Sequence, residues 1–259
     1  MKDLILITGA SSGIGYHMAV QLAQQNFDLI ITARSAEDLL KVKQTLSEKY
    51  SVNVHVFPAD LSKPGNAETL FKDINAEGLV VTKVVNNAGF GLYGKFVELP
   101  LDEQLRMIEL NVSSVVVLTK LFSEQMVKRG SGTILNVASL LSFLPFPYYS
   151  VYSATKAFVL AFSETAAAEL EGTGVSITTL CPGPVDTNFT TPAMLSTNAY
   201  KAHRPVSPES VAKAGVELLL KGSGKKIVGF NNWFISNLPR ITPDKIMIKI
   251  KKHLASQRN

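Results

Sequence analysis

The stretch Leu4-Ile5-Leu6-Ile7-Thr8-Gly9-Ala10-Ser11-Ser12-Gly13-Ile14-Gly15 decides the fold of this 259-residue chain. Its first five residues form an apolar run that is typical of a buried strand, and residues 14–25 carry apolar side chains at helical spacing. The glycines between them allow a tight turn and a close approach of the backbone to a ligand. Because a helix start presents unpaired N–H groups, the turn predicts a phosphate-binding loop for a nucleotide cofactor.

The three glycines follow the spacing Gly9-x3-Gly13-x-Gly15, which differs from the G-x-G-x-x-G of the dinucleotide fingerprint. A plain turn is therefore the alternative. The strand before the loop, the helix after it and its place at the first strand–helix junction favour a cofactor loop. The residues predicted to line it are Gly9, Ser11, Ser12, Gly13, Ile14 and Gly15.

Seven apolar segments recur along the chain, with helical patterns between them. Strands are predicted at residues 4–8, 29–33, 52–57, 83–86, 133–137, 176–181 and 226–230, and the helices include 102–129, 152–171 and 208–221. This alternation predicts an α/β fold, a Rossmann-like doubly wound seven-stranded parallel sheet in three αβα layers. Residues 1–230 are expected to form one dinucleotide-binding and catalytic domain. Ligands of such sheets bind beyond the carboxyl ends of the strands, where the irregular segments 140–151 and 184–206 would lie.

The formal net charge of +5 lies at the C-terminal end of the chain. Residues 240–259 contain six basic side chains and one acid, whereas the first 239 residues are neutral, which disfavours a nucleic-acid binder. The single cysteine, Cys181, excludes an intrachain disulfide, and the N-terminal residues lack the features of a signal peptide. No apolar run reaches the roughly 20 residues of a membrane-spanning helix. A cytoplasmic location is expected.

The end of the second predicted strand indicates which nicotinamide cofactor is used. A carboxylate there would hold the ribose 2′-hydroxyl of NAD(H). The chain instead reads Ile31-Thr32-Ala33-Arg34-Ser35, without an acid. Because a guanidinium pairs with phosphate through charge-assisted hydrogen bonds, Arg34 predicts NADP(H). A solvated arginine at a helix start is the alternative.

A serine, a tyrosine and a lysine form the candidate catalytic group. Ser139 ends the fifth predicted strand, and Tyr152 and Lys156 share one face of a helix because they are four residues apart. A nearby ammonium is expected to lower the pKa of the Tyr152 phenol, which could then exchange a proton with a carbonyl oxygen. Ser139 could hydrogen-bond the same oxygen.

Together these motifs resemble the short-chain dehydrogenase/reductase (SDR) family, in its short, NADP-preferring branch. The resemblance covers about residues 1–230 and is carried by Thr8-Gly9-x3-Gly13-x-Gly15, Asn86-Asn87-Ala88-Gly89, Asn111, Ser139, Tyr152-x3-Lys156 and Pro182-Gly183. It implies an oxidoreductase that transfers a hydride between NADP(H) and a carbonyl or alcohol.

The resemblance also implies a role for each matching residue. Tyr152 would be the general acid/base and Ser139 would orient the carbonyl. Lys156 would lower the pKa of Tyr152 and hold the ribose, and Asn111 would hold a relay water. The remaining cofactor contacts would be Asp60 and Leu61 at the adenine, Asn87, Ala88 and Gly89 along the adenosine, and Pro182, Gly183, Val185 and Thr187 at the nicotinamide.

The segments on either side of the expected nicotinamide site are apolar, which predicts a hydrophobic carbonyl or alcohol substrate. They carry Leu140, Leu141, Phe143, Leu144, Phe146, Tyr148 and Tyr149 before the catalytic tyrosine, and Phe189, Met194 and Leu195 after Thr187. Similar enzymes reduce 3-oxoacyl thioesters and keto steroids, and an aromatic ketone would also fit. The alternative is that some of these side chains pack helices or subunits.

Residues 231–259 extend beyond the usual family pattern. Thr242-Pro243-Asp244 predicts a helix start, with Thr242 as the N-cap. Ile246, Met247, Ile250 and Leu254 then share one face, which predicts a basic amphipathic helix over about 242–255. This helix could contact an anionic membrane surface, cover the substrate pocket, or pack on the domain or a partner subunit.

Other partners and functions follow from the same residues. Similar proteins are often homodimers or homotetramers that pair through their long helices, here near 102–129 and 152–171. The four histidines, His17, His55, His203 and His253, have no ligand spacing, so no metal is expected. The alternative function is an NADP(H)-binding regulator or scaffold without turnover, against which the intact catalytic group argues.

Overall fold

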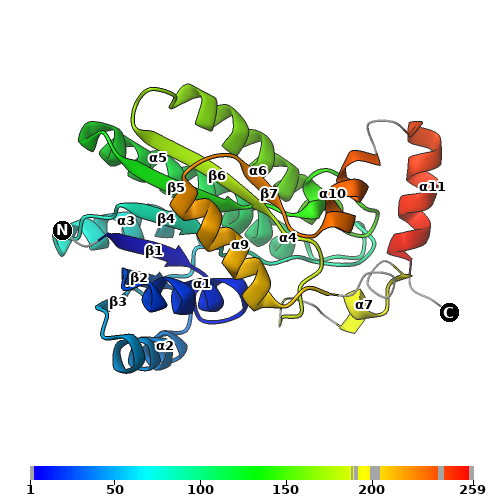
Figure 1. The fold of residues 1–259 in the computed structure, drawn as a ribbon. Coiled ribbons are helices and arrows are strands. Elements are labelled where there is room, and N and C mark those ends of the chain that lie inside the picture. Colours follow the sequence, from blue (N-terminus) through cyan, green and yellow to red (C-terminus); the bar gives the residue numbers. More distant parts are fainter. Residues whose placement is uncertain (1–2, 188, 190–191, 199–204, 239–241, 257–259) are drawn as a thin grey trace.

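The computed structural model describes residues 3–187, 189, 192–198, 205–238 and 242–256. Seven strands form one sheet in the order β3-β2-β1-β4-β5-β6-β7, and every neighbouring pair is parallel (Figure 1). The strands are β1 (Leu4–Thr8), β2 (Asp28–Thr32), β3 (Val54–Val56), β4 (Lys83–Asn86), β5 (Gly132–Val137), β6 (Val175–Cys181) and β7 (Lys225–Ile227). The predicted α/β fold with a doubly wound parallel sheet is confirmed.

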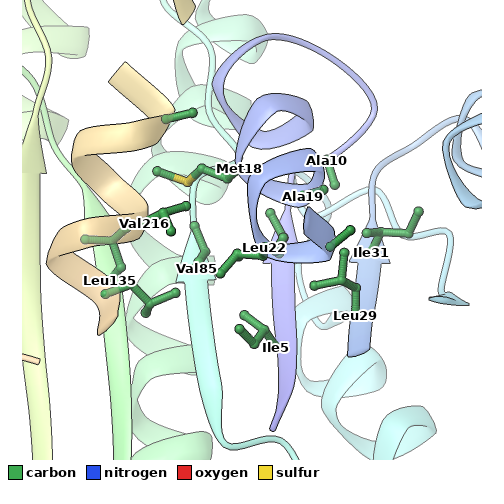
Figure 2. Close-up of a cluster of buried hydrophobic side chains, with 14 of the residues drawn as sticks. Ile5, Ala10, Met18, Ala19, Leu22, Leu29, Ile31, Val85, Leu135 and Val216 are labelled. Atoms are coloured by element: carbon green, nitrogen blue, oxygen red, sulfur yellow. The ribbon is translucent and has the colours of Figure 1, made fainter. Parts of the chain in front are cut away.

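Helices cover both faces of this sheet. They include α1 (Gly13–Gln24), α2 (Ala36–Tyr50), α3 (Asn66–Ala76), α4 (Leu101–Ile108), α5 (Ser114–Arg129), α6 (Ser150–Glu169), α7 (Pro192–Leu195) and α9 (Pro208–Lys221). Alternate side chains of each strand point to opposite faces. Ile5 and Ile7 of β1 therefore pack in one cluster with Met18 and Leu22 of α1 and Val216 of α9, and Figure 2 shows most of it.

The second face has its own apolar core. Leu4 and Leu6 of β1 point away from the first cluster and pack with Leu118, Phe122 and Met126 of α5. All five side chains are buried. Burial on both faces explains why the strands read as continuous apolar runs rather than as alternating patterns.

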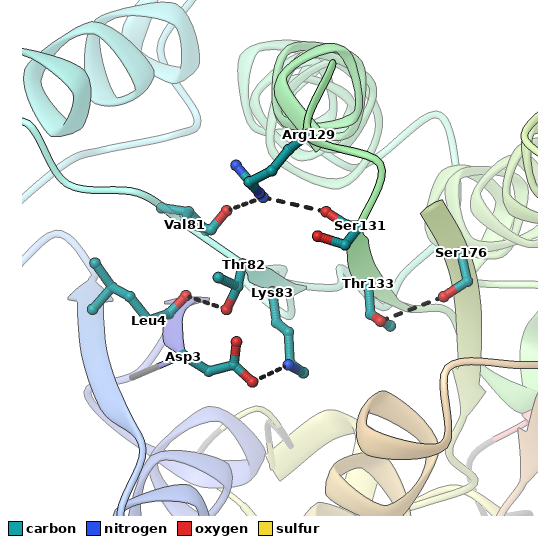
Figure 3. A network of polar contacts seen from close by, with 9 residues as sticks. All are labelled: Asp3, Leu4, Val81, Thr82, Lys83, Arg129, Ser131, Thr133 and Ser176. Carbon is teal, nitrogen blue, oxygen red and sulfur yellow. Dashed lines mark hydrogen bonds and ion pairs between the residues drawn. The ribbon is translucent and has the colours of Figure 1, made fainter. Parts of the chain in front are cut away.

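The amino ends of the strands are joined by polar contacts, which Figure 3 shows. Lys83 donates a hydrogen bond of 2.5 Å to the carboxylate of Asp3, and Arg129 donates one of 2.9 Å to the carbonyl of Val81. These contacts lie at the edge opposite the carboxyl ends, where ligands of such sheets bind.

The predicted strand 226–230 needs a correction at its end. Strand β7 ends at Ile227, and Phe230 begins helix α10 (Phe230–Asn237). Gly229 turns the chain at a φ of 94°, a conformation that few other residues adopt. The apolar residues that follow β7 therefore belong to a helix.

A last helix, α11 (Asp244–Ala255), confirms that the extension is helical, but the predicted cap is wrong. Pro243 is the N-cap residue, and no side chain caps this helix start. The Thr242 N–H instead donates to the Leu238 carbonyl, which continues the preceding turn. Arg240 and Arg258 of the basic tail lie outside the described residues.

Candidate active site

One cavity of about 1010 Å³ brings most of the predicted site residues together at the carboxyl ends of the strands. The predicted residues that line it are Gly9, Ser11, Ser12, Gly13, Ile14, Arg34, Asp60, Leu61, Asn87, Ala88, Gly89, Ser139, Tyr152, Lys156, Pro182, Gly183, Val185 and Thr187. Gly15 and Asn111 do not line the cavity, but they lie next to the lining residues Gly9 and Gly89 respectively. The cavity has a polar half at the glycine loop and an apolar half beyond Tyr152.

The glycine loop depends on Gly15, although this residue does not face the cavity. A Cβ atom at Gly15 would lie 2.3 Å from the carbonyl oxygen of Gly9, which is closer than real contacts. Asn87 holds the same turn by donating to the carbonyl of Thr8 at 3.0 Å. The loop is therefore fixed before any ligand arrives, with the start of α1 behind it.

A carboxylate and two guanidinium groups mark the far end of the polar half. Burial raises the pKa of Asp60, but hydrogen bonds from Ser62 and the charges of Arg106 and Arg34 outweigh it, so this pKa lies below its usual range. Arg106 also donates to the Ser62 hydroxyl at 3.3 Å. Sequence reasoning missed Arg106 and Ser62 because nothing in the local pattern of α4 brings that helix to the cofactor side.

Tyr152 and Ser139 lie at the junction of the two halves of the cavity. Both residues are only 8% exposed. Burial raises the pKa of Tyr152 to about 12, although its side-chain hydrogen bond with Ser139 acts in the opposite direction. This phenol is therefore protonated at neutral pH, and such a group can donate a proton to a carbonyl oxygen.

The pKa of Tyr152 is raised by burial rather than lowered, whereas the sequence predicts a lowered pKa beside Lys156. The Lys156 ammonium group donates a hydrogen bond of 2.8 Å to the Val137 carbonyl. Burial lowers the pKa of Lys156 to about 8. Desolvation therefore dominates at both residues, because it disfavours the charged form of each.

Asn111 lies in a π-helical turn, Glu109–Ser113, that joins α4 to α5 within the predicted helix 102–129. Its side chain is fully buried and donates to the Phe90 carbonyl at 2.9 Å and to the Thr155 hydroxyl at 3.1 Å. A Cβ atom at Gly89 would lie 3.0 Å from Asn111 Oδ1 and 3.4 Å from Lys156 Nζ, so these two groups flank Gly89. π-Helical turns are frequent at functional sites.

The apolar half of the cavity is built from segments that are far apart in the sequence. Of the predicted substrate residues, Leu140, Leu141, Leu144, Phe146, Tyr149, Phe189 and Met194 line it. Phe143, Tyr148 and Leu195 do not; the Lys225 ammonium, for example, lies 5.3 Å from the Phe143 ring centroid. The C-terminal region also lines the cavity, with α11 on its wall, which is one of the three alternatives for this helix. The lining residues from this region are Ile235, Leu238, Thr242, Met247, Ile250, Lys251 and Leu254.

The remaining candidate features do not form a second site among the described residues. Cys181 is fully buried and belongs to an apolar cluster with Val159 and Leu160. Within the described ranges, no three His, Cys, Asp or Glu residues gather as metal ligands would, and His203 lies outside these ranges. None of the described helices has both the length and the apolar character needed to cross a bilayer.

Comparison with known families gives one match over most of the chain. The family model for short chain dehydrogenases matches residues 3–197. Among curated proteins, the very-long-chain 3-oxoacyl-CoA reductase of Anas platyrhynchos is 31% identical over 258 residues, which are 97% of this chain and 81% of that protein. The probable oxidoreductase EphD of Mycobacterium tuberculosis is 36% identical over 189 residues, which are 72% of this chain. This chain spans only 31% of the length of EphD.

Solved structures share the architecture of most of the chain. A structure described for 7beta-hydroxysteroid dehydrogenase stereoselectivity has a TM-score of 0.84 and 26% identity, with 96% of each chain covered. A short-chain dehydrogenase from Sphingobium yanoikuyae in complex with NADPH has a TM-score of 0.81 and 26% identity, with 92% of this chain and 93% of that chain covered. The similarity therefore includes the region that forms the cavity.

Proposed function

Because the chain belongs to the short-chain dehydrogenase family, we propose that it uses NADPH to reduce a carbonyl group on a hydrophobic substrate. Family membership makes it an NAD(P)-dependent oxidoreductase of carbonyl and alcohol substrates. The observation that carries the finer proposal is the position of Tyr152 and Ser139 between a polar and an apolar half of one cavity. A 3-oxoacyl thioester, a steroid-like ketone or an aromatic ketone fits the apolar half.

The polar half of the cavity fits a dinucleotide. The glycine loop at the start of α1 suits the pyrophosphate, and Arg34 suits a 2′-phosphate. Asp60 and Leu61 would hold the adenine, and Thr187 would lie at the nicotinamide. The NADPH complex of the Sphingobium yanoikuyae relative supports NADPH over NADH.

In the proposed reduction, bound NADPH would supply a hydride to the carbonyl carbon. Tyr152 donates its phenolic proton to the carbonyl oxygen, and Ser139 donates a hydrogen bond to the same oxygen. With its raised pKa, Tyr152 is protonated at neutral pH and can act as the proton donor. Lys156 would hold the ribose hydroxyls, and Asn111 would hold a water for proton return.

Tyr152→Phe tests the proposed reaction, because it removes the acidic hydroxyl and keeps the ring. We expect at least a hundredfold loss of kcat, in line with general acid catalysis, with an unchanged Kd for NADPH. Loss of NADPH absorbance at 340 nm with a panel of aliphatic, steroid and aromatic ketones measures turnover. If the wild-type protein binds NADPH but reduces no ketone of the panel, the alternative of an NADP(H)-binding regulator or scaffold replaces this proposal.

The proposal extends to location and assembly. We place the protein in the cytoplasm as a homodimer or homotetramer, a state that the exposed apolar side chains of Leu101, Leu105 and Phe158 on α4 and α6 support. Peripheral contact with an anionic membrane through 242–255 is also proposed. Ile246 and Ile248 of α11 are exposed together with Lys245, Lys249 and Lys252, a combination that suits an anionic lipid surface.

A further inference from the structure

Helix α11 is fastened to the rest of the protein at its C-terminal end. The Tyr93 hydroxyl donates a hydrogen bond of 2.7 Å to the Ala255 carbonyl. On the other side, the Asn198 side chain donates to the His253 carbonyl at 3.0 Å, and the Asn198 N–H donates to the Ser256 carbonyl at 3.2 Å. The last carbonyls of a helix have no partner within it, and these contacts give partners to carbonyl groups at this end of α11.

The face of α11 that these contacts hold is the face that closes the cavity. Met247, Ile250 and Leu254 all line the apolar half, and Met247 is only 5% exposed. Ile246 and Ile248 are more than half exposed. The helix therefore rests on the protein through one face, and the hydrogen bonds from Tyr93 and Asn198 hold the C-terminal end of that face in place.

Tyr93 also contacts the segment that leads to the catalytic tyrosine. Its ring centroid lies 5.0 Å from that of Tyr149 and 5.7 Å from that of Tyr148. Tyr149 in turn lies 6.4 Å from Tyr152 and faces the cavity. The ring of Tyr93 thus touches the cavity wall that precedes Tyr152, while its hydroxyl holds α11.

This segment is one that needs support from its neighbours. Tyr148 has a φ of 66°, a left-handed conformation that costs a residue other than glycine about 1 kcal/mol or more. Gly94, which follows Tyr93 in the chain, donates a hydrogen bond of 3.0 Å from its N–H to the Tyr148 carbonyl. The loop that carries Tyr93 therefore stabilises both the strained turn and α11.

We propose that Tyr93 is a positioning residue for substrate size: it holds α11 against the cavity so that bulky apolar substrates contact Met247, Ile250 and Leu254. This inference rests on the proposed function and adds a determinant of the substrate class. We expect the binding of a small ketone at Tyr152 to be independent of Tyr93. A ketone with a fused-ring body extends further from Tyr152, and we expect it to lose contacts with α11 when the helix moves.

Tyr93→Phe tests the role because it keeps the ring and removes only the hydroxyl. Tyr148→Phe is the matched control, since it removes a hydroxyl from the same aromatic cluster, no described bond joins that hydroxyl to α11, and Tyr148 does not line the cavity. With NADPH, we expect the KM of Tyr93→Phe for trans-1-decalone to rise about fivefold, the effect of one hydrogen bond, with kcat nearly unchanged. The KM for cyclohexanone should stay within twofold, and Tyr148→Phe should change neither value.

Hydrogen–deuterium exchange of peptides from 244–255 gives a second readout that does not need turnover. Exchange should rise in Tyr93→Phe and not in Tyr148→Phe. Equal KM changes for both ketones, or unchanged exchange in α11, would overturn the proposal. If Tyr93→Phe does not fold, Asn198→Ala removes the side-chain hydrogen bond to the His253 carbonyl on the other side of the same helix. It must then raise the KM for trans-1-decalone and leave the KM for cyclohexanone unchanged.

The wild-type protein separates this inference from the proposed function. If it reduces neither ketone with NADPH, the proposed function fails for such substrates, whereas the exchange comparison still tests whether Tyr93 holds α11. If the wild type reduces both ketones and Tyr93→Phe changes the KM for both ketones equally or for neither, the proposed function is supported and the proposed role of Tyr93 is wrong.

Discussion

At the scale of single residues, burial rather than charge pairing sets the proton affinities in the site. Tyr152 and Lys156 are both nearly inaccessible, and each is shifted toward its neutral form, to a pKa of about 12 and about 8 respectively. A Tyr-x3-Lys motif alone suggests the opposite shift for the tyrosine. Burial explains the difference, because it raises the pKa of Tyr152 by more than the hydrogen bond with Ser139 lowers it.

The lowered pKa of Lys156 predicts a specific dependence of stability on pH. Its pKa is about 8 in the folded protein and near the ordinary 10.5 when unfolded, so the unfolded chain binds more protons between these values. The penalty for the buried ammonium, up to about 3 kcal/mol, is full below pH 8 and is relieved as the pH rises from 8 to 10.5.

Lys156→Met isolates this contribution, because methionine fills similar space without a charge. The free energies of unfolding of the cofactor-free proteins are measured in urea from pH 7 to 10. Relative to Lys156→Met, the wild type should gain stability as the pH rises above 8. A difference between the two proteins that is constant with pH would contradict the assignment of a buried, destabilised cation.

Arg34 is the residue on which the choice of cofactor depends. Arg34→Glu should raise the Kd for NADPH by about 30-fold or more, since a charge-assisted hydrogen bond contributes about 2 kcal/mol and the new carboxylate repels a phosphate. The Kd for NADH should stay the same or fall. Arg34→Gln is the matched control that separates lost attraction from added repulsion, and fluorescence titration measures each Kd. Equal losses for both cofactors would show that Arg34 does not contact the 2′-phosphate.

At the scale of elements, the loop between β1 and α1 predicts how the cofactor site fails. A methyl group at Gly15 would overlap the Gly9 carbonyl oxygen, so Gly15→Ala must displace the loop. We expect a lower Tm and a rise of tenfold or more in the Kd for NADPH, because overpacking costs about 1–3 kcal/mol. Gly65→Ala is the control: its Cβ meets nothing within 4 Å, but its φ of 83° imposes strain. It should lower the Tm without changing the Kd for NADPH.

The elements also show which features the sequence could predict. Local patterns predict the seven strands and the group of Ser139, Tyr152 and Lys156. Burial on both faces of the sheet gives continuous apolar runs, and the four-residue spacing places Tyr152 and Lys156 on one helix face. The contact between Tyr93 and Ala255 joins residues 162 positions apart and leaves no such mark. The π-helical turn at Asn111 could not be predicted from the local sequence either. The Asn111 side chain is held by Phe90 and Thr155, which come from distant segments.

Helix α10 shows a different limit of sequence reasoning. The predicted strand 226–230 includes Phe230, whereas Trp233 and Phe234 belong to no predicted element. In the structure these three side chains are more than half exposed on one face of a short helix. An exposed aromatic face of this kind marks an interaction surface, which local hydrophobicity cannot distinguish from a core strand.

At the scale of the whole molecule, the basic tail gives a test of membrane contact that leaves the cavity intact. Lys245, Lys249 and Lys252 are exposed, whereas the cavity wall uses other positions of α11. Changing all three to Gln should reduce sedimentation with phosphatidylserine vesicles at least tenfold, since each basic residue near an anionic surface contributes about 1 kcal/mol. Turnover of soluble ketones should be unchanged.

A control removes the same charge from elsewhere on the surface. Lys43, Lys72 and Lys213 are exposed on α2, α3 and α9, and changing them to Gln alters the net charge by the same amount. This variant should sediment like the wild type. Equal loss in both variants would mean that net charge alone governs binding, and no sedimentation of the wild type would exclude a membrane role for α11.

The two ends of the described chain differ in what can be attached to them. Asp3 lies at the amino edge of the sheet beside Lys83, away from the cavity (Figure 3). Ser256 instead accepts a hydrogen bond from Asn198 at the end of the helix that walls the substrate site. An affinity tag, reporter or surface-immobilisation handle therefore belongs at the N-terminus. We expect a C-terminal fusion to displace α11 from the cavity wall. The lower activity measured for such a fusion would not be a property of the enzyme itself.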